Sequence, residues 1–123
     1  MKQKQDQTQW VVEFAIKEGK LGAFKKLAEE FVARVKQNEP GAMSYQWYFN
    51  DDETKCIVSE WYENSEAILA HIGGSAVSTL FPKLLETAQL TRFEVYGDPS
   101  EEAKNVLAKF GAQNYHSFVG FTR

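Results

Sequence analysis

The chain has 123 residues, a net charge of −3 and an aromatic content of 14%. This length predicts one domain that buries its core without disulfides. The acidic balance argues against a nucleic-acid partner, and no apolar run is long enough to span a membrane. Residues 1–9 are polar and lack the apolar core of a signal peptide, so we expect a frayed tail and a cytoplasmic protein.

The first half of the chain changes from a strand pattern to a helical pattern. Residues 10–17 (WVVEFAIK) are mostly apolar and β-branched, which predicts a strand. From Lys20 on, apolar residues recur at steps of three and four, which predicts an amphipathic helix. These residues are Leu21, Phe24, Leu27, Ala28, Phe31 and Val35. The segment 38–41 (NEPG) ends the helix, because proline disfavours helical backbone in the residue before it.

Two strands rich in aromatic residues follow, 42–50 (AMSYQWYFN) and 55–62 (KCIVSEWY), with a polar turn between them. Strand alternation places one row on one face, namely Met43, Tyr45, Trp47 and Phe49. It places a second row on the other face, namely Ala42, Ser44, Gln46 and Tyr48. The second row is less hydrophobic than the first but carries no charge, so we expect both faces of this hairpin to be buried.

The second half predicts three helices and two strands. Asn64 or Ser65 is expected to cap a helix that ends at 73–74 (GG), and residues 75–87 form a further short helix that Pro82 bends or restarts. Residues 90–96 predict a strand. The segment 98–101 (DPSE) predicts a helix start with Asp98 as the cap, and residues 115–121 predict a last strand.

This order of elements predicts an α+β, ferredoxin-like domain, in which an antiparallel sheet carries its helices on one face. The other face then needs a cover. Each large apolar side chain left in water forgoes about 1.5–3 kcal/mol. We therefore expect a homodimer in which two sheets pack face to face.

The segments 39–48 (EPGAMSYQWY) and 60–71 (EWYENSEAILAH) resemble the antibiotic biosynthesis monooxygenase domain. The family pattern has Glu-Pro-Gly, a small and an apolar residue, and a strand that contains tyrosine. A polar hairpin, a strand ending in Glu-x-aromatic and an acidic helix start leading to Ala-His come next. The resemblance covers about residues 10–96, and residues 97–123 look like a helix–strand extension of the same domain.

The resemblance implies a dimeric α/β barrel and a small aromatic substrate. Members include cofactor-independent monooxygenases that oxidise quinols or anthrones with molecular oxygen, and relatives that degrade haem. The haem-degrading relatives use an asparagine in the first strand, where this chain has Val12, Glu13 and Phe14. They also use a tryptophan and a histidine on the helices, and His71 lies near the place of that tryptophan. We therefore expect that the protein uses no cofactor.

A cofactor-free oxygenase needs an apolar pocket, hydrogen bonds to a phenolate and one proton acceptor. His71 is the first candidate acceptor because its ordinary pKa is near neutral, although a histidine that only packs at the domain edge is an alternative. Glu60 is the second candidate, with a salt bridge to Arg92 or Arg34 as the alternative. Candidates for substrate binding are Tyr45, Trp47, Trp61, Tyr62, Phe81 and Arg92. The aromatic ones can equally pack in the core or a dimer interface, and Arg92 can pair with a carboxylate across the sheet.

His71, His116 and Cys56 do not have the spacing of metal ligands, so we expect no metal site and an unreactive, buried Cys56. Three functions stay open: a quinol or anthrone oxygenase, a non-catalytic ligand-binding dimer, and an isomerase or cyclase of aromatic intermediates. A pocket too small for one aromatic ring would favour the non-catalytic ligand-binding dimer. Turnover without oxygen would favour the isomerase or cyclase.

Overall fold

The computed structural model describes residues 7–123 of the chain. In this part the elements follow one another as β1 (Thr8–Ile16), α1 (Leu21–Asn38), β2 (Ala42–Phe49), β3 (Lys55–Tyr62), α2 (Ser65–Ile72), α3 (Ser75–Thr87), β4 (Ala88–Tyr96), α4 (Glu101–Ala108) and β5 (Gln113–Tyr115). The five strands form one sheet in the order β2-β3-β1-β4-β5. Neighbours run antiparallel, except that β5 pairs in parallel with β4.

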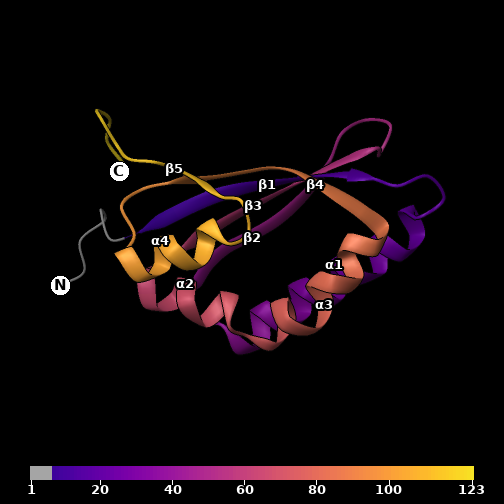
Figure 1. Cartoon of the computed structure of the whole chain (residues 1–123), viewed down its shortest axis with the longest axis horizontal. Helices are drawn as coiled ribbons and strands as arrows, with labels where there is room; N and C mark the ends of the chain where they lie inside the picture. The colour runs from indigo at the N-terminus through magenta and orange to yellow at the C-terminus, as the bar shows by residue number, and fades with distance from the viewer. Residues whose placement is uncertain (1–6) are drawn as a thin grey trace.

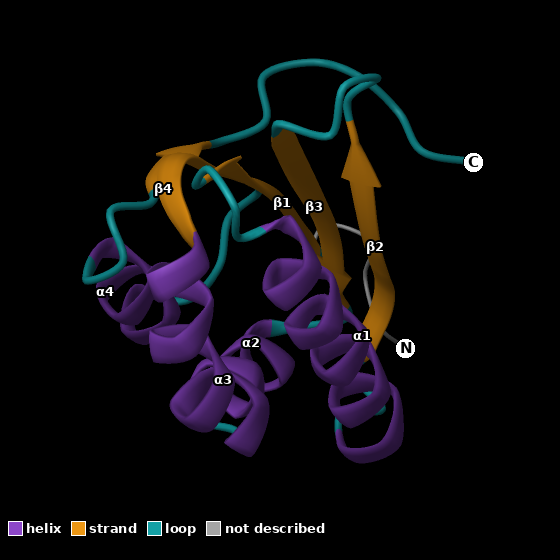
Figure 2. Cartoon of the chain, turned by 90° about the vertical axis from the view of Figure 1, so that its right-hand side faces the viewer, coloured by secondary structure: helices purple, strands orange, loops and turns teal. Residues whose placement is uncertain are grey.

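The helices lie on one side of this sheet, as two perpendicular views show (Figure 1, Figure 2). The order β2-β3-β1-β4 is the one that two crossed β-α-β units give, so the predicted ferredoxin-like α+β fold is confirmed. After β4, α4 packs against α2, and β5 adds a strand beside β4.

The core lies between the sheet and the helices. β1 points Trp10, Val12 and Phe14 towards the helices, and the residues between them are more exposed. The register of β1 and β3 places Glu60 opposite Trp10, so one carboxylate enters an otherwise apolar face. The helices close the core with Phe24, Phe31, Val35, Ile68, Leu80, Leu84 and Leu107.

The turn between α1 and β2 is fixed against α2. A Cβ on Gly41 would come 2.5 Å from the Cβ of Ala67, so only glycine fits this close approach. The side chain of Asn64 caps α2 by accepting a hydrogen bond from the Ala67 N–H at 2.9 Å. The N–H of Gly73 donates back to the Leu69 carbonyl and ends the helix. These contacts hold the end of α1 beside α2.

Several predicted boundaries are wrong in detail. The first strand begins at Thr8, so residues 8–9 belong to the sheet and not to the predicted tail, whose residues 1–6 lie outside the described part. β4 begins at Ala88, because Ala88 pairs with Ile16 directly after α3. A register shift between Ala42 and Ser44 leaves Met43 50% exposed instead of on the inner face of β2. The helix predicted over 75–87 is confirmed with the same bounds, and it continues through Pro82.

The C-terminal predictions also need correction. Ser100, and not Asp98, caps α4: its side chain accepts a hydrogen bond from the Ala103 N–H at 3.2 Å, and the helix begins one residue later. The last strand is Gln113–Tyr115 instead of 115–121, because the chain leaves the sheet edge after Tyr115. Phe118 and Phe121 are therefore exposed.

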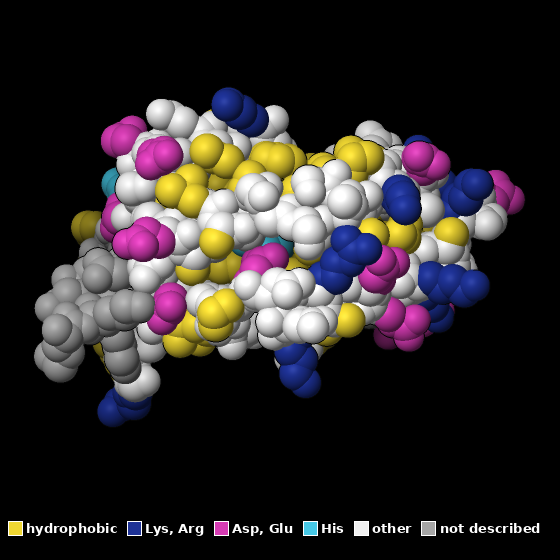
Figure 3. Space-filling model, turned by 90° about the horizontal axis from the view of Figure 1, so that it is seen from below, with side chains coloured by type: hydrophobic (Ala, Val, Ile, Leu, Met, Phe, Trp, Pro, Cys, Tyr) yellow, Lys and Arg dark blue, Asp and Glu magenta, His cyan; other side chains and the backbone are white. Residues whose placement is uncertain are grey.

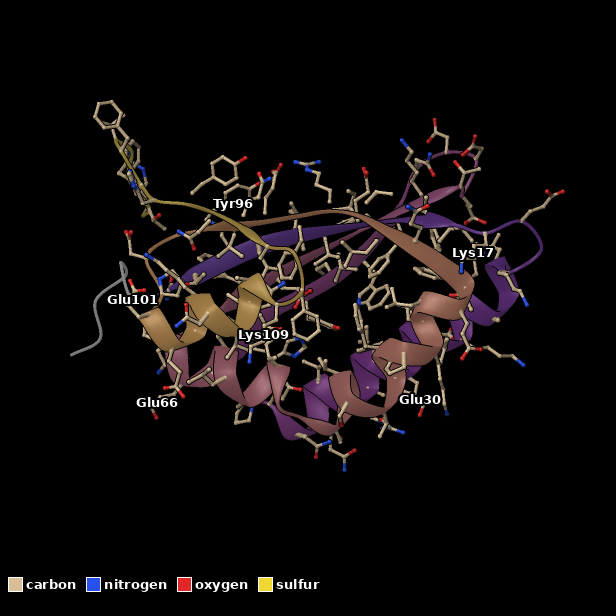
Figure 4. All side chains as sticks on the ribbon, viewed as in Figure 1. Lys17, Glu30, Glu66, Tyr96, Glu101 and Lys109 are labelled. Atoms are coloured by element: carbon tan, nitrogen blue, oxygen red, sulfur yellow. The ribbon has the colours of Figure 1, made fainter. Side chains whose placement is uncertain are left out.

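The sheet face opposite the helices has no cover from the described helices. Val11, Ile57 and Trp61 are partly exposed on this outer face, and Tyr48 is 57% exposed. Tyr96 stands on the same side of the sheet (Figure 4). Among the described residues, no single helix is long and apolar enough to cross a membrane; α2 and α3 pass that test only together, across a 55° bend.

Candidate functional site

The buried interior contains a histidine held between two carboxylates. The Nδ1 of His71 lies 2.7 Å from Oε1 of Glu39, and its Nε2 lies 3.4 Å from Oε1 of Glu60. The exposed fractions are 4% for His71, 5% for Glu60 and 9% for Glu39. Burying such groups is costly unless they are paired and hydrogen-bonded. We call these three residues the Glu39–His71–Glu60 cluster.

Three elements bring the cluster together. Glu39 directly follows α1, and its backbone N–H still donates to the Val35 carbonyl at 2.9 Å, which fixes the residue at the helix end. His71 lies in the last turn of α2. Glu60 points inward from β3 because it alternates with less buried positions and shares its face with Val58. The turn at Gly41 and the cap of α2 thus set the distance between Glu39 and His71.

Two aromatic side chains support Glu60 from behind. The hydroxyl of Tyr62 donates a hydrogen bond to Oε1 of Glu60 at 2.7 Å. The ring of Trp10 stacks on Tyr62 with centroids 4.6 Å apart, and it lies 6.2 Å from the ring of His71. The hydrogen bond from Tyr62 thus helps to fix the carboxylate of Glu60.

The cluster changes the proton affinity of its members. Burial lowers the pKa of His71, but the hydrogen bond to Glu39 and the negative charges of Glu60 and Glu39 outweigh it, so the pKa of His71 is raised. Burial raises the pKa of Glu60, and the charge of His71 and the hydrogen bond from Tyr62 oppose this only in part. Coupled groups titrate as a unit. His71 and Glu60 therefore hold protons more tightly than they do in water.

A cavity of about 50 Å³ lies beside the cluster, between the sheet and the helices. Four side chains with polar atoms, Tyr45, Trp47, Glu60 and His71, are part of its lining. The rest of the lining is mostly apolar and includes Val77, Phe81, Leu84, Leu90, Phe93 and Phe110. Seen from the helical side, hydrophobic side chains gather in patches between charged ones (Figure 3). The cavity is thus mostly apolar, with a few polar side chains in its lining.

The structure brings most of the predicted site residues together. His71, Glu60, Tyr45, Trp47 and Phe81 line the cavity. The ring of Tyr45 lies 5.8 Å from the ring of His71 and 6.0 Å from that of Trp47. Tyr62 is fully buried behind Glu60 and does not line the cavity. Whether the lining residues act on a substrate stays a prediction.

Trp61 and Arg92 lie outside the cavity. Trp61 is on the outer sheet face, paired with Gln9. Arg92 would share a face with Leu90 in a regular strand, but the register of β1 and β4 shifts between Glu13 and Phe14. Leu90 therefore lines the cavity, whereas Arg92 is exposed.

The predicted ion pairs of these residues differ as well. Arg92 lies 3.0 Å from Glu94 of its own strand, and not from a carboxylate across the sheet. Arg34 pairs with Glu30 on the surface of α1. Glu60 has neither arginine as a partner, since its contacts are with His71 and Tyr62.

Two residues of the site, Glu39 and Trp10, are not predicted as site residues from the sequence. Glu39 belongs there to the segment that ends α1 and to the Glu-Pro-Gly pattern of the family, and Trp10 is a strand residue. The available signal was the Glu-Pro-Gly pattern, which places a carboxylate at a fixed helix end. Nothing in the spacing showed that its side chain turns inward to a histidine 32 positions away.

Metal binding and nucleophilic catalysis by cysteine have less support in the described residues. There, no group of three or more His, Cys, Asp or Glu side chains is placed to hold a metal ion. Cys56 is fully buried, as expected, and burial raises its pKa to about 12. Its thiol is therefore a poor nucleophile.

Fold and site together define a small α+β domain with a buried, proton-binding cluster in a cavity between sheet and helices. The chain belongs to the antibiotic biosynthesis monooxygenase family: the model of that family matches residues 10–81. The resemblance seen in the sequence is thereby confirmed. None of the curated proteins matches the chain.

Solved structures of the same fold include MupZ from Pseudomonas fluorescens, which is 27% identical with a TM-score of 0.81. That match covers 95% of this chain and 94% of MupZ, so it extends into α4 and β5. A candidate antibiotic biosynthesis monooxygenase from Caulobacter crescentus CB15 is 23% identical (TM-score 0.70), with 79% of this chain and 93% of that chain covered. A protein from Methanosarcina mazei Go1 is 18% identical (TM-score 0.70; 77% and 95% covered). The Caulobacter crescentus and Methanosarcina mazei proteins share the fold of this chain.

Proposed function

We propose that the chain is a cofactor-independent monooxygenase that oxidises a small, electron-rich aromatic substrate, such as a quinol or an anthrone. The observation that carries this proposal is the Glu39–His71–Glu60 cluster, whose His71 and Glu60 line a mostly apolar cavity. Membership of the family supports the reaction class. In this proposal the deprotonated substrate reduces oxygen itself, so neither metal nor flavin nor haem takes part.

His71 and Glu60 together accept the proton. Both line the cavity, and the pKa of each is raised, which makes the pair a stronger base than either group in water. Glu39 holds the imidazole by its Nδ1. Burial and the nearby charges of Glu60 and Glu39 raise the pKa of Tyr45 well above its usual value, so Tyr45 stays protonated and donates a hydrogen bond to the substrate anion.

The oxidation then balances without a further reagent. For an anthrone-like substrate, the carbanion left by proton transfer gives one electron to O₂, and the resulting radical and superoxide combine to a peroxide. The proton held by the cluster returns to the peroxide, which loses water and leaves a carbonyl: R₂CH₂ + O₂ → R₂C=O + H₂O. The apolar walls keep bulk water from the reactive anion.

The size of the cavity favours a second candidate function, a non-catalytic ligand-binding protein. A dry cavity of roughly 150 Å³ binds benzene, whereas this cavity measures about 50 Å³. An aromatic substrate must therefore widen it. The contact between Phe81 of α3 and Phe110 after α4, with centroids 5.6 Å apart, is the wall that we expect to open.

Oxygen uptake with anthrone or a hydroquinone tests the proposal. His71→Ala removes the proton acceptor, and we expect the rate to fall about 10²- to 10⁴-fold. His116→Ala is the matched control, because His116 is exposed and outside the cavity. Equal rates in wild type and His71→Ala would contradict the role of His71. Ligand binding without any oxygen uptake by the wild type would favour the non-catalytic function.

The proposal includes a homodimer formed through the outer sheet face. Val11, Ile57, Trp61 and Tyr48 leave an apolar surface there that the chain's own helices do not cover. A second copy packed on this surface would remove it from water.

A further inference from the structure

The C-terminal part of the chain contributes one wall of the cavity through Phe110. This residue follows α4, and its ring is part of the cavity lining. The family model matches residues 10–81, so Phe110 belongs to a part of the chain outside that match. The end of α4, marked by the neighbouring Lys109, lies towards the middle of the molecule (Figure 4). A segment outside the family match thus shapes the cavity.

The cavity comes close to solvent where Phe110 meets α3. Phe110, Phe81, Val77 and Leu90 line the cavity but are only partly buried, whereas the three lining residues of β1 are buried. The rings of Phe81 and Phe110 meet edge to face, with centroids 5.6 Å apart and planes at 75°. Because both rings face the cavity on one side and solvent on another, their contact separates the two.

Phe81 is the more firmly held of these two rings. It lies inside α3, directly after the buried Leu80. Its ring also contacts that of Phe14 in β1, with centroids 6.5 Å apart. Protein cores are closely packed, so a movement of Phe81 would disturb residues of both layers.

Phe110 is held less firmly, because the helix before it has already ended at Ala108. The buried residues that anchor α4, Ala103 and Leu107, come earlier in the chain. Gly111 follows directly, with a φ of +86° and open space around its missing Cβ. Glycine rotates freely between backbone conformations, and hinges often consist of a few such loop residues. The ring of Phe110 can therefore swing outwards while Leu107 stays buried.

We propose that Phe110 is the gate of the cavity and that its ring limits the size of the aromatic ligand that the cavity admits. The closed cavity of about 50 Å³ is smaller than the roughly 150 Å³ that hold a benzene molecule, so even one aromatic ring must displace the gate. The ligand then takes the place of Phe110 against Phe81. This inference rests on the proposed function only in that the cavity binds an aromatic ligand, and it adds the residue that selects ligands by size.

Binding of phenol and 2-naphthol under nitrogen tests the gate without turnover. Both probes carry one hydroxyl, and 2-naphthol is larger by one fused ring. Phe110→Ala removes a ring from the wall, so the affinity for 2-naphthol relative to phenol should rise about 10- to 200-fold. Phe118→Ala, the same substitution at an exposed position outside the cavity, should leave this ratio unchanged. An unchanged ratio in folded Phe110→Ala would overturn the inference.

The rate of binding gives a second test that needs no cavity-enlarging variant. Because the gate must open before the ligand enters, the observed binding rate of 2-naphthol to the wild type should level off at high ligand concentration. Phe110→Trp puts a larger ring in the gate and should lower this plateau. A rate that rises linearly with concentration, and equally in both proteins, would contradict the gate.

The gate and the proposed function fail separately. Failure of oxygen uptake would leave both binding measurements untouched. Binding of neither probe, by the wild type or by Phe110→Ala, would contradict the ligand cavity and the proposed function with it. An unchanged affinity ratio would contradict only the role of Phe110.

Discussion

Glu39 acts on the site through His71. Its carboxylate accepts the Nδ1–H of the imidazole at 2.7 Å, and this bond is the second-largest influence on the pKa of His71 after burial, which it opposes. The bond also leaves Nε2 directed to Glu60. Glu39 is therefore a positioning residue for the proposed proton acceptor.

Glu39→Gln separates the charge of this residue from its shape. The amide oxygen can still accept the Nδ1–H, but the negative charge that stabilises the imidazolium is lost, so the pKa of His71 should fall. Because the proposed reaction needs the unprotonated pair, activity rises with pH through its apparent pKa. The acid limb of kcat/KM should then move to lower pH, by about 1–3 units.

Glu66→Gln is the control for this shift. Glu66 lies on α2, the helix of His71, but it is exposed and points away from the sheet (Figure 4). Its profile should match that of the wild type. An unchanged acid limb in Glu39→Gln would show that the carboxylate does not set the proton affinity of the site.

At the scale of residues, the sequence predicted which side chains have suitable chemistry but only part of their placement. His71, Glu60 and Tyr45 follow from residue type and strand alternation. The prediction that Arg92 lies in the site was wrong, because the register shift beside Phe14 changes the sheet face to which Arg92 points. Such bulges leave little trace in an alternating sequence pattern. Glu39 was missed because the direction of a side chain at a helix end depends on tertiary contacts.

The element that holds the site together is the turn from α1 into β2. Gly41 lets this turn approach α2, and a Cβ at this position would meet the Cβ of Ala67 at 2.5 Å. Real contacts between carbon atoms need about 3.5–4.0 Å. Any larger residue therefore pushes α2, with His71, away from Glu39.

Gly41→Ala should destabilise the protein by about 1–3 kcal/mol, as overpacking does. Urea unfolding measures this change, and the activity of the folded variant should fall as well. Gly22→Ala is the matched control: Gly22 lies in α1 with open space around its missing Cβ, so alanine should be neutral or stabilise by up to about 1 kcal/mol. Equal stability of the two variants would contradict this account of the turn.

Helices and strands were predictable where a periodic pattern of apolar residues ends at residues that disfavour its continuation. The helix at 21–38 and the hairpin follow from periodicity, the Asn-Glu-Pro-Gly segment and the polar turn. The chain's end was not predictable in the same way. Residues 115–121 have strand-forming composition, but a strand needs a neighbour to pair with, and after Tyr115 the chain has left the sheet edge.

For the whole molecule, the uncovered outer sheet face leads to a prediction about assembly. Wild-type protein should sediment as a dimer, about twice the 14.0 kDa of one chain. Trp61→Glu places a charge on the outer face and should yield single folded subunits. Leu85→Glu, at an exposed position of α3 on the helical side, should stay dimeric. A well-folded single subunit in dilute wild-type solution would contradict the proposed assembly.

In the proposed reaction His71, held by two buried carboxylates, removes a proton from an aromatic substrate. The most direct measurement mixes the protein with anthrone under nitrogen at neutral pH and records the absorption band of the anthrone anion. We expect this band with the wild type and with His116→Ala, and its loss with His71→Ala. A band of equal strength with His71→Ala, or no band with the wild type, would contradict it.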